Sequence, residues 1–164
     1  MFYEEVFRKL AQENVEYVVV GGVALVLHGV VRLTGDLDLF LEMGSANLGR
    51  FVGAMTALGY KPKVPVKAED FIKPEKRRQW KKEKGMQVFS FYHPEKPMDL
   101  IDVFVDEPMP YEEVKRYKKV VEAKGIQIPV LSVKHLKQLK RISARPQDLA
   151  DIEALEEMES EQSE

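Results

Sequence analysis

Two aspartates separated by one residue, Asp36 and Asp38, stand inside the apolar segment "GDLDLFLE". Side chains alternate along a β-strand, so both carboxylates would point to one face, roughly 7 Å apart at the backbone. Taken alone, such a pair fits a solvent-facing edge strand just as well. The two charges repel each other unless a cation lies between them, and carboxylate oxygens are ligands that Mg²⁺ prefers. Two such ions can clamp the attacking and leaving oxygens of a phosphoryl transfer.

A third carboxylate would complete a metal site of this kind. The later segment "PMDLIDVFVDE" reads as a strand and offers three candidates: Asp99, Asp102 and Asp106. Asp99 and Asp102 point to opposite faces of that strand, so only one of them can join the first pair. Asp102 is favoured because Ile101 and Val103 then form a continuous apolar face opposite it, and Asp99 is the alternative.

A glycine pair, Gly21-Gly22, follows the β-branched run "EYVVV" and precedes "VALVLHGV". A strand, a glycine turn and a helix let backbone N–H groups approach a phosphate closely, because glycine tolerates the backbone angles that such a turn needs. Tight turns also use glycine pairs constantly. The pair alone is therefore weak evidence for a phosphate site.

These residues must be positioned by alternating strands and helices. The apolar periodicity predicts helices over residues 3–15, 23–30, 48–60, 111–123, 132–143 and 146–158, and strands over 16–20, 36–42, 86–93, 98–105 and 126–132. The fold class is therefore α/β (α+β), with a mixed sheet flanked by helices. A length of 164 residues suits one domain, 1–164, with two closing helices at about 132–158 and an acidic tail that frays after Met158.

Residues 61–84 differ from the rest in composition. They hold ten Lys or Arg against four Asp or Glu, and three prolines interrupt them, which predicts an exposed, partly irregular segment. Trp80 lies in "RRQWKKEKG", and an aromatic ring among basic residues can stack on a nucleic-acid base. A solvated loop or a partner interface is the commoner use of such a charge run.

Composition excludes several classes of function. The net charge is −2 and cysteine is absent, which removes disulfides, zinc thiolate sites and cysteine nucleophiles. The three histidines share no metal-ligand spacing, so a zinc site is not expected. The opening "MFYEEVFRKL" does not read as a signal peptide, and no apolar run is long enough to span a membrane. These features predict a cytoplasmic protein without a membrane partner.

The combination of features is more specific than its parts. A glycine pair, a spacer of thirteen residues, an Asp-apolar-Asp run and a later strand aspartate resemble the signature of the polymerase-β-like nucleotidyltransferase superfamily. "RLTGDLDLF" is similar to the Arg-x-Thr-x-Asp-x-Asp variant of small members, which include minimal nucleotidyltransferases and the toxins of type IV toxin–antitoxin systems. "LKQLKRISARPQDLADIEAL" resembles the closing element of the family. The resemblance covers roughly residues 15–157, apart from the basic middle segment.

The resemblance implies a nucleotidyltransferase-like fold and a reaction that depends on Mg²⁺, with Mn²⁺ as a substitute. A nucleoside monophosphate would pass from an NTP to an acceptor hydroxyl, with release of pyrophosphate. Asp36, Asp38 and Asp102 would hold the metal and act in catalysis, the last two nearer the attacking hydroxyl. The residues that the resemblance assigns to nucleotide binding are Gly21, Gly22, Arg32, Thr34 and Lys140.

Some of these residues have a second interpretation. Arg32 equally fits a structural ion pair with a carboxylate, and Lys140 fits an ordinary solvated helix lysine. In the closing element, Arg145 matches the family pattern, while Asp148 and Asp151 lie near a helix start where they also suit the helix dipole.

The sequence leaves the acceptor open among a protein, a tRNA end and a small molecule such as an antibiotic. It also leaves open a cognate toxin or antitoxin partner. The alternative function is a non-catalytic nucleotide- or RNA-binding module that retains the fold. Degenerate members normally lose one aspartate of the pair, and both are present here, which favours catalysis.

Overall fold

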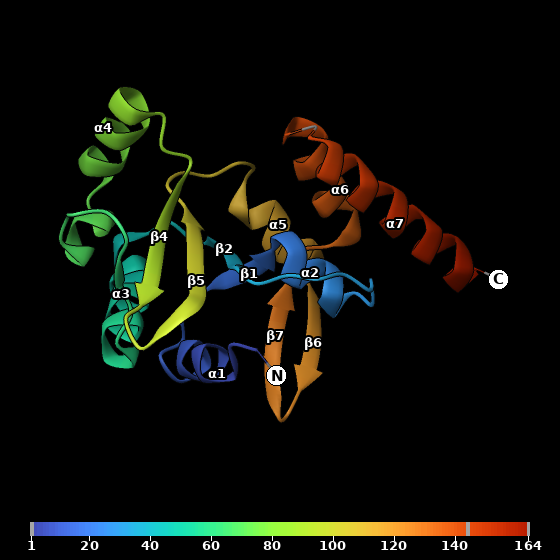
Figure 1. Ribbon diagram of the computed structural model, residues 1–164, viewed down its shortest axis with the longest axis horizontal. Coiled ribbons are helices and arrows are strands. Elements are labelled where there is room, and N and C mark those ends of the chain that lie inside the picture. The colour runs from blue at the N-terminus through green and yellow to red at the C-terminus, as the bar shows by residue number, and fades with distance from the viewer. Residues whose placement is uncertain (1, 144, 164) are drawn as a thin grey trace.

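The computed structural model describes residues 2–143 and 145–163, and in that part of the chain a seven-stranded mixed sheet has the order β3-β4-β5-β2-β1-β7-β6 (Figure 1). The two central strands, β1 and β2, are antiparallel to each other. Each is parallel to its outer neighbour, β7 for β1 and β5 for β2. The strands are β1 Tyr17–Val20, β2 Leu37–Leu41, β3 Lys61–Pro62, β4 Val88–His93, β5 Lys96–Phe104, β6 Lys119–Ala123 and β7 Ile126–Val130. The predicted mixed sheet is confirmed.

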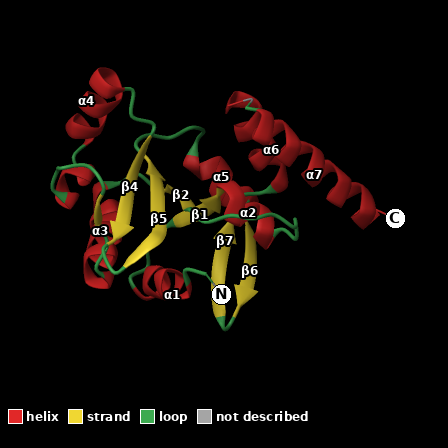
Figure 2. Cartoon of the chain, in the orientation of Figure 1, coloured by secondary structure: helices red, strands yellow, loops and turns green. Residues whose placement is uncertain are grey.

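Helices surround this sheet, with α3 and α4 beside β4 and the pair α6–α7 at the opposite end of the molecule (Figure 2). The helices are α1 Glu4–Gln12, α2 Gly21–Leu27, α3 Ser45–Leu58, the 3₁₀ helix η1 Ala68–Ile72, α4 Pro74–Lys84, α5 Tyr111–Tyr117, α6 Val133–Ser143 and α7 Pro146–Ser163. No helix among the described residues is long and apolar enough to cross a membrane.

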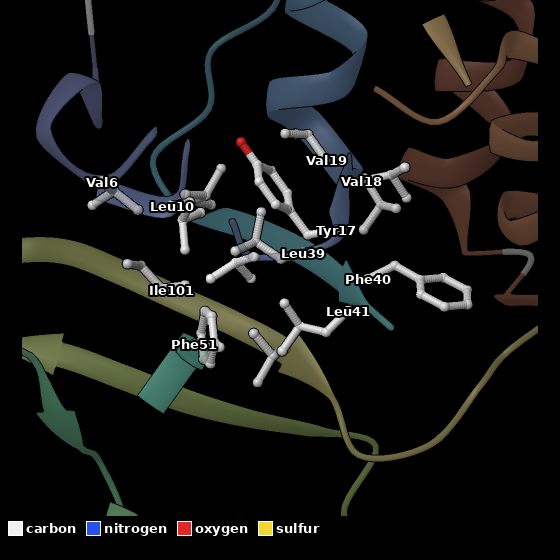
Figure 3. Packing of buried hydrophobic residues seen from close by; sticks show 14 of the residues in the cluster. Val6, Leu10, Tyr17, Val18, Val19, Leu39, Phe40, Leu41, Phe51 and Ile101 are labelled. Atoms are coloured by element: carbon white, nitrogen blue, oxygen red, sulfur yellow. The ribbon is translucent and has the colours of Figure 1, made fainter. Parts of the chain in front are cut away.

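The central strand β2 is buried on both faces. Leu39 faces the helices α1 and α3, and Figure 3 shows it grouped with Ile101 and Phe51. The ring of Phe40 points the other way and packs against Tyr111 of α5, with ring centroids 5.4 Å apart. This alternation puts Asp38 on the same face as Phe40. The carboxylate therefore stands at the end of an apolar strand face.

The helix predicted over residues 111–123 is wrong in its second half. Helix α5 ends at Tyr117, and residues 119–123 form β6, which pairs antiparallel with β7. Lys124 and Gly125 connect the two strands with φ angles of 50° and 75°, the positive values that a tight hairpin turn requires. The run "YKKVVEA" fits a helix locally, but pairing with the neighbouring strand satisfies its backbone and decides the structure.

The segment 61–84 is more regular than its prolines and charges predicted. Pro74 begins α4, where a missing N–H costs nothing, and Gly85 ends it with a left-handed φ of 62°. Trp80 is only 5% exposed and stacks on Phe89, with ring centroids 5.0 Å apart. The suggestion that Trp80 stacks on a nucleic-acid base is therefore wrong, because its ring is used in the core.

The second closing helix is longer than predicted. Helix α7 continues through the acidic tail to Ser163 instead of ending near Met158. Its buried apolar residues, Ile152 and Leu155, lie one turn apart and pack against the rest of the fold. The acidic residues beyond Met158 extend the helix without adding to this buried face.

Candidate active site

Asp38 and Asp102 lie directly beside each other on neighbouring strands. In the parallel pairing of β2 with β5, Asp38 is the register partner of Asp102. Asp36 immediately precedes β2, is exposed, and falls on the same face as Asp38. The side chain of Asp99 instead meets the hydroxyl of Tyr60 at 3.3 Å. Sheet register thus brings Asp102, and not Asp99, to the first pair of aspartates.

The electrostatics of these carboxylates are those of a crowded anionic site. Burial raises the pKa of Asp38 to about 7, and the neighbouring charges of Asp102 and Asp36 push it in the same direction. Burial also raises the pKa of Asp102. This rise is opposed by Ser90, whose hydroxyl donates a hydrogen bond of 2.5 Å to the Asp102 carboxylate. Such an excess of negative charge is what a divalent cation would relieve.

The donor set suits an ion that arrives with a phosphate. Among the described residues, no group of three His, Cys, Asp or Glu side chains is arranged to hold a metal by itself. Mg²⁺ rarely uses such an all-protein cage; it binds through one or two carboxylates and completes its shell with water and substrate phosphates. The adjacent carboxylates of Asp38 and Asp102 fit that mode of binding.

The glycine pair lies against the aspartates. It forms the first turn of α2, whereas the sequence predicted a turn before the helix. Gly21 has a φ of +67°, and a Cβ built there would lie 2.2 Å from an Asp38 carboxylate oxygen. A Cβ on Gly22 would lie 2.5 Å from the Thr34 hydroxyl. Glycine is therefore required at both positions for the backbone to approach Asp38 and Thr34 this closely.

Arg32 and Lys140 meet at one carboxylate, that of Asp151. The Arg32 guanidinium lies 2.6 Å from the Asp151 carboxylate, and the Lys140 ammonium lies 2.8 Å from the same oxygen. Both cations also lower the pKa of Asp38, so both lie within electrostatic reach of the aspartate site. The contacts of Arg32 match its predicted structural ion pair, and Lys140 is buried rather than solvated.

Asp148 and Asp151 hold the closing helices together. Both are 3% exposed. The carboxylate of Asp148 accepts a 2.9 Å hydrogen bond from Arg145 and lies 3.6 Å from the Lys140 ammonium. These contacts join α6, α7 and the loop before β2 into one ionic network. The two aspartates therefore do more than complement a helix dipole.

Sequence reasoning missed two residues at the site. Ser90 on β4 faces Asp102 in the antiparallel register, and only that register identifies it. The hydroxyl of Tyr3 donates to the Gly35 carbonyl and also meets the Leu100 backbone at 3.3 Å. Tyr3 thereby ties the segment before Asp36 to β5. No local motif marks either residue.

The sequence matches no protein-family model and no curated protein. Solved structures do resemble this one. The lincomycin-bound lincosamide antibiotic adenylyltransferase LnuA aligns with a TM-score of 0.59 at 16% identity, over 94% of this chain and 96% of that one. A putative nucleotidyltransferase from Thermotoga maritima, TM1012, aligns with a TM-score of 0.57 at 17% identity, over 96% and 89%. ANT(2″)-Ia in complex with adenylyl-2″-tobramycin aligns with a TM-score of 0.58 at 13% identity, over 95% and 90%.

The chain shares its fold with these nucleotidyltransferases, which is the nucleotidyltransferase-like fold that the sequence motifs predicted. The structural similarity extends over nearly the whole chain. The toxin–antitoxin branch of the family that the motifs resemble stays a prediction.

Proposed function

We propose that this protein is a Mg²⁺-dependent nucleotidyltransferase that transfers a nucleoside monophosphate from an NTP to an acceptor hydroxyl and releases pyrophosphate. The observation that carries the proposal is that residues of β2, β5 and the start of α2 come together at one place. Asp38 and Asp102 are register partners on parallel strands, and Gly21 lies against Asp38. A carboxylate pair beside a close-approaching backbone is what a metal–triphosphate substrate needs.

The residues of the chain have separate tasks in this proposal. Asp36, Asp38 and Asp102 would hold Mg²⁺, with Mn²⁺ as a substitute, and the bound ion would neutralise the triphosphate and polarise the α-phosphorus. The backbone at Gly21 and Gly22 would receive the triphosphate, assisted by Thr34. Arg32 and Lys140 would add positive charge on the side of Asp151. Catalysis by such a site rests on positioning and electrostatic stabilisation.

Asp102 is the carboxylate proposed to take the proton of the acceptor hydroxyl. The hydroxyl oxygen forms a bond to the α-phosphorus while the bond from that phosphorus to the bridging β-phosphate oxygen breaks. Pyrophosphate leaves with the electron pair. Ser90 already occupies one oxygen of Asp102, which orients the carboxylate for this task.

A transfer assay tests the proposal. The protein is incubated with each labelled NTP, Mg²⁺ or Mn²⁺, and a mixture of cell protein, tRNA and small hydroxylated acceptors. Asp36→Ala should abolish transfer without unfolding, because Asp36 is exposed. Asp106→Ala is the matched control, since Asp106 lies just past the end of β5 and its carboxylate pairs with Lys81. Full activity in Asp36→Ala would disprove the assignment.

A second pair of variants separates the two candidates for the third carboxylate. Asp102→Ala should lose transfer, whereas Asp99→Ala should retain it, because the Asp99 side chain meets Tyr60. A toxin or antitoxin role stays a prediction of the resemblance. Growth arrest on expression, relieved by a neighbouring gene product that co-purifies with the protein, would test it.

A further inference from the structure

A row of side chains crosses four strands from the aspartate site to the edge of the sheet. Asp38 is the register partner of Asp102, and Asp102 is the partner of Ser90. The amide of Lys63, just past β3, donates to the Ser90 carbonyl at 2.9 Å, which puts Lys63 next in the row. The positive charge of Lys63 also lowers the pKa of Asp102. Its ammonium therefore lies within electrostatic reach of that carboxylate.

A second row runs beside the first. Leu100 is the register partner of Tyr92, and Tyr92 is the partner of Lys61. Asp36 precedes Leu37, whose partner is Ile101, so Asp36 falls beside Leu100 at the other end of the row. This second row therefore also begins at an aspartate and ends at a lysine of the edge strand.

These two rows lie on an open face of β3, β4 and β5. The opposite face is filled by Phe89 and Phe91, which are buried against Phe71 and Trp80 of η1 and α4. On the open face, by contrast, Tyr92 is 36% exposed, and Lys61 and Lys63 are exposed. Figure 1 shows β4 and β5 toward the viewer, in front of α3. We call the surface of Lys61, Lys63, Ser90 and Tyr92 the acceptor face.

The two lysines of the acceptor face are exposed and differ in their contacts from several lysines elsewhere on the surface. Lys73, Lys81 and Lys115 each pair with a carboxylate. Within the described residues, neither Lys61 nor Lys63 forms an ion pair. Two exposed cations on one face attract an anion. They begin the segment 61–84, in which basic residues exceed acidic ones by six.

We propose that the acceptor face binds a single-stranded nucleic acid, whose terminal hydroxyl is the acceptor of the transfer. Lys61 and Lys63 would contact successive backbone phosphates, and a base would stack on the exposed ring of Tyr92. Neighbouring strands lie about 4.8 Å apart, so the two-strand interval from Asp102 to Lys63 is roughly 10 Å at the backbone. That interval accommodates the terminal nucleotide, with its hydroxyl at Asp102 and the next phosphate near Lys63.

The charge pattern favours this acceptor over a neutral small molecule. Basic side chains combined with an exposed aromatic ring are the usual means of binding a single strand without reading its sequence. A small hydroxylated acceptor would need neither the two lysines nor the ring. The proposal rests on the proposed function for the transfer step, while the binding step can be measured without any catalysis.

The binding test uses fluorescein-labelled single-stranded RNA and DNA of the same sequence, without NTP or Mg²⁺. Fluorescence anisotropy is followed across a range of salt concentrations. Each lysine–phosphate contact contributes about 0.7 to the slope of log K against log salt. Lys61→Gln/Lys63→Gln should therefore lower the slope by about 1.4 for whichever strand is the ligand. The matched control is Lys118→Gln/Lys119→Gln, which removes two exposed lysines at the far end of the sheet.

Tyr92 supplies a second, independent variant. Tyr92→Ala should weaken binding by about 5- to 160-fold, whereas Tyr92→Phe should bind as the wild type does, because the stacking surface is retained. Both variants should keep the melting temperature close to that of the wild type, since the Tyr92 side chain is partly in solvent.

The outcomes separate this proposal from the proposed function. Suppose that a nucleic-acid strand binds through Lys61 and Lys63, and that Asp36→Ala binds this strand but does not extend it. This result supports both the proposed function and the acceptor face. If the wild type binds the strand through these lysines but does not transfer a nucleotide to it, the proposed nucleotidyltransferase activity is disproved. The acceptor face then stands as a binding surface alone. Transfer to a small molecule alone, or equal loss of binding in the Lys118/Lys119 control, would overturn the acceptor face.

Discussion

Gly21→Ala is a single methyl group added where the glycine pair meets the aspartates. Gly21 has a φ of +67°, a left-handed conformation that costs an alanine about 1–2 kcal/mol. The new Cβ would lie 2.2 Å from a carboxylate oxygen of Asp38 and 3.1 Å from its Cβ. Since Asp38 belongs to a strand, its Cβ cannot withdraw without moving the backbone. The whole carboxylate must rotate away from the glycine.

The expected result has two parts. For a chain of 164 residues, 1 kcal/mol shifts the melting temperature by about 2–4 °C, so Gly21→Ala should melt about 2–8 °C lower. Activity should fall much further, by about 100-fold or more, because a displacement of about 1 Å in a reacting group costs that much. Thermal unfolding and transfer of labelled NMP, measured on the same preparation, give both values.

Gly35→Ala is the control for this prediction. Gly35 lies next to Asp36, but a Cβ there would meet nothing within 4 Å. Its melting temperature and its rate of transfer should therefore stay near those of the wild type. Wild-type activity in Gly21→Ala, or an equal loss in Gly35→Ala, would refute the reasoning that the close approach of Gly21 to Asp38 builds the site.

Three further predictions concern charge and packing. The pKa of Asp38 is raised from 3.8 to about 7, so ionising this carboxylate opposes folding, and without Mg²⁺ the free energy of unfolding should fall as pH rises from about 4 to 7. Asp38→Asn should remove this pH dependence and melt at a higher temperature than the wild type at pH 8 but not at pH 4, with a gain of at most about 4 kcal/mol. Identical pH profiles of the two proteins would contradict this prediction. Asp151→Ala leaves the buried Lys140 without its nearest carboxylate and should lower the free energy of unfolding, measured in urea, by about 3–5 kcal/mol. A loss under 1 kcal/mol would show that the ionic network contributes little to stability. Trp80→Ala should also lower the free energy of unfolding by about 3–5 kcal/mol, since the ring is buried on Phe89. It should leave the affinity for single-stranded nucleic acid unchanged. Weaker binding at a temperature where the variant is folded would contradict the buried role of Trp80.

The local sequence pattern was sufficient to predict those helices and strands whose apolar residues recur with a regular period. The alternation around Asp36 and Asp38 predicted a strand with both carboxylates on one face, and β2 confirms the strand. The apolar periodicity predicted helices that the structure confirms at α1, α3, α6 and α7, although several of their ends differ. These predictions succeed because side-chain direction follows from the period of each element, which is a property of neighbours in sequence.

Residues 119–123 and 61–84 show where local pattern fails. The first stretch suits a helix until β7 is available as a pairing partner. The second reads as solvated until Trp80 finds a ring to stack on, which a charge count does not reveal. In both cases a partner distant in sequence or structure supplies the stabilisation that decides the conformation.

The sequence by itself determined which residues could make a metal and phosphate site: an Asp-x-Asp strand, a glycine pair and a later aspartate on another strand. Only the tertiary structure decided how they meet. The pairing of β2 with β5 chose Asp102 over Asp99, and the docking of α6–α7 brought Lys140 and Asp151 to Arg32. The register of β3 and β4 added Lys61 and Lys63. The physical reason is that strand pairing and helix docking depend on contacts between distant segments, which no local spacing specifies.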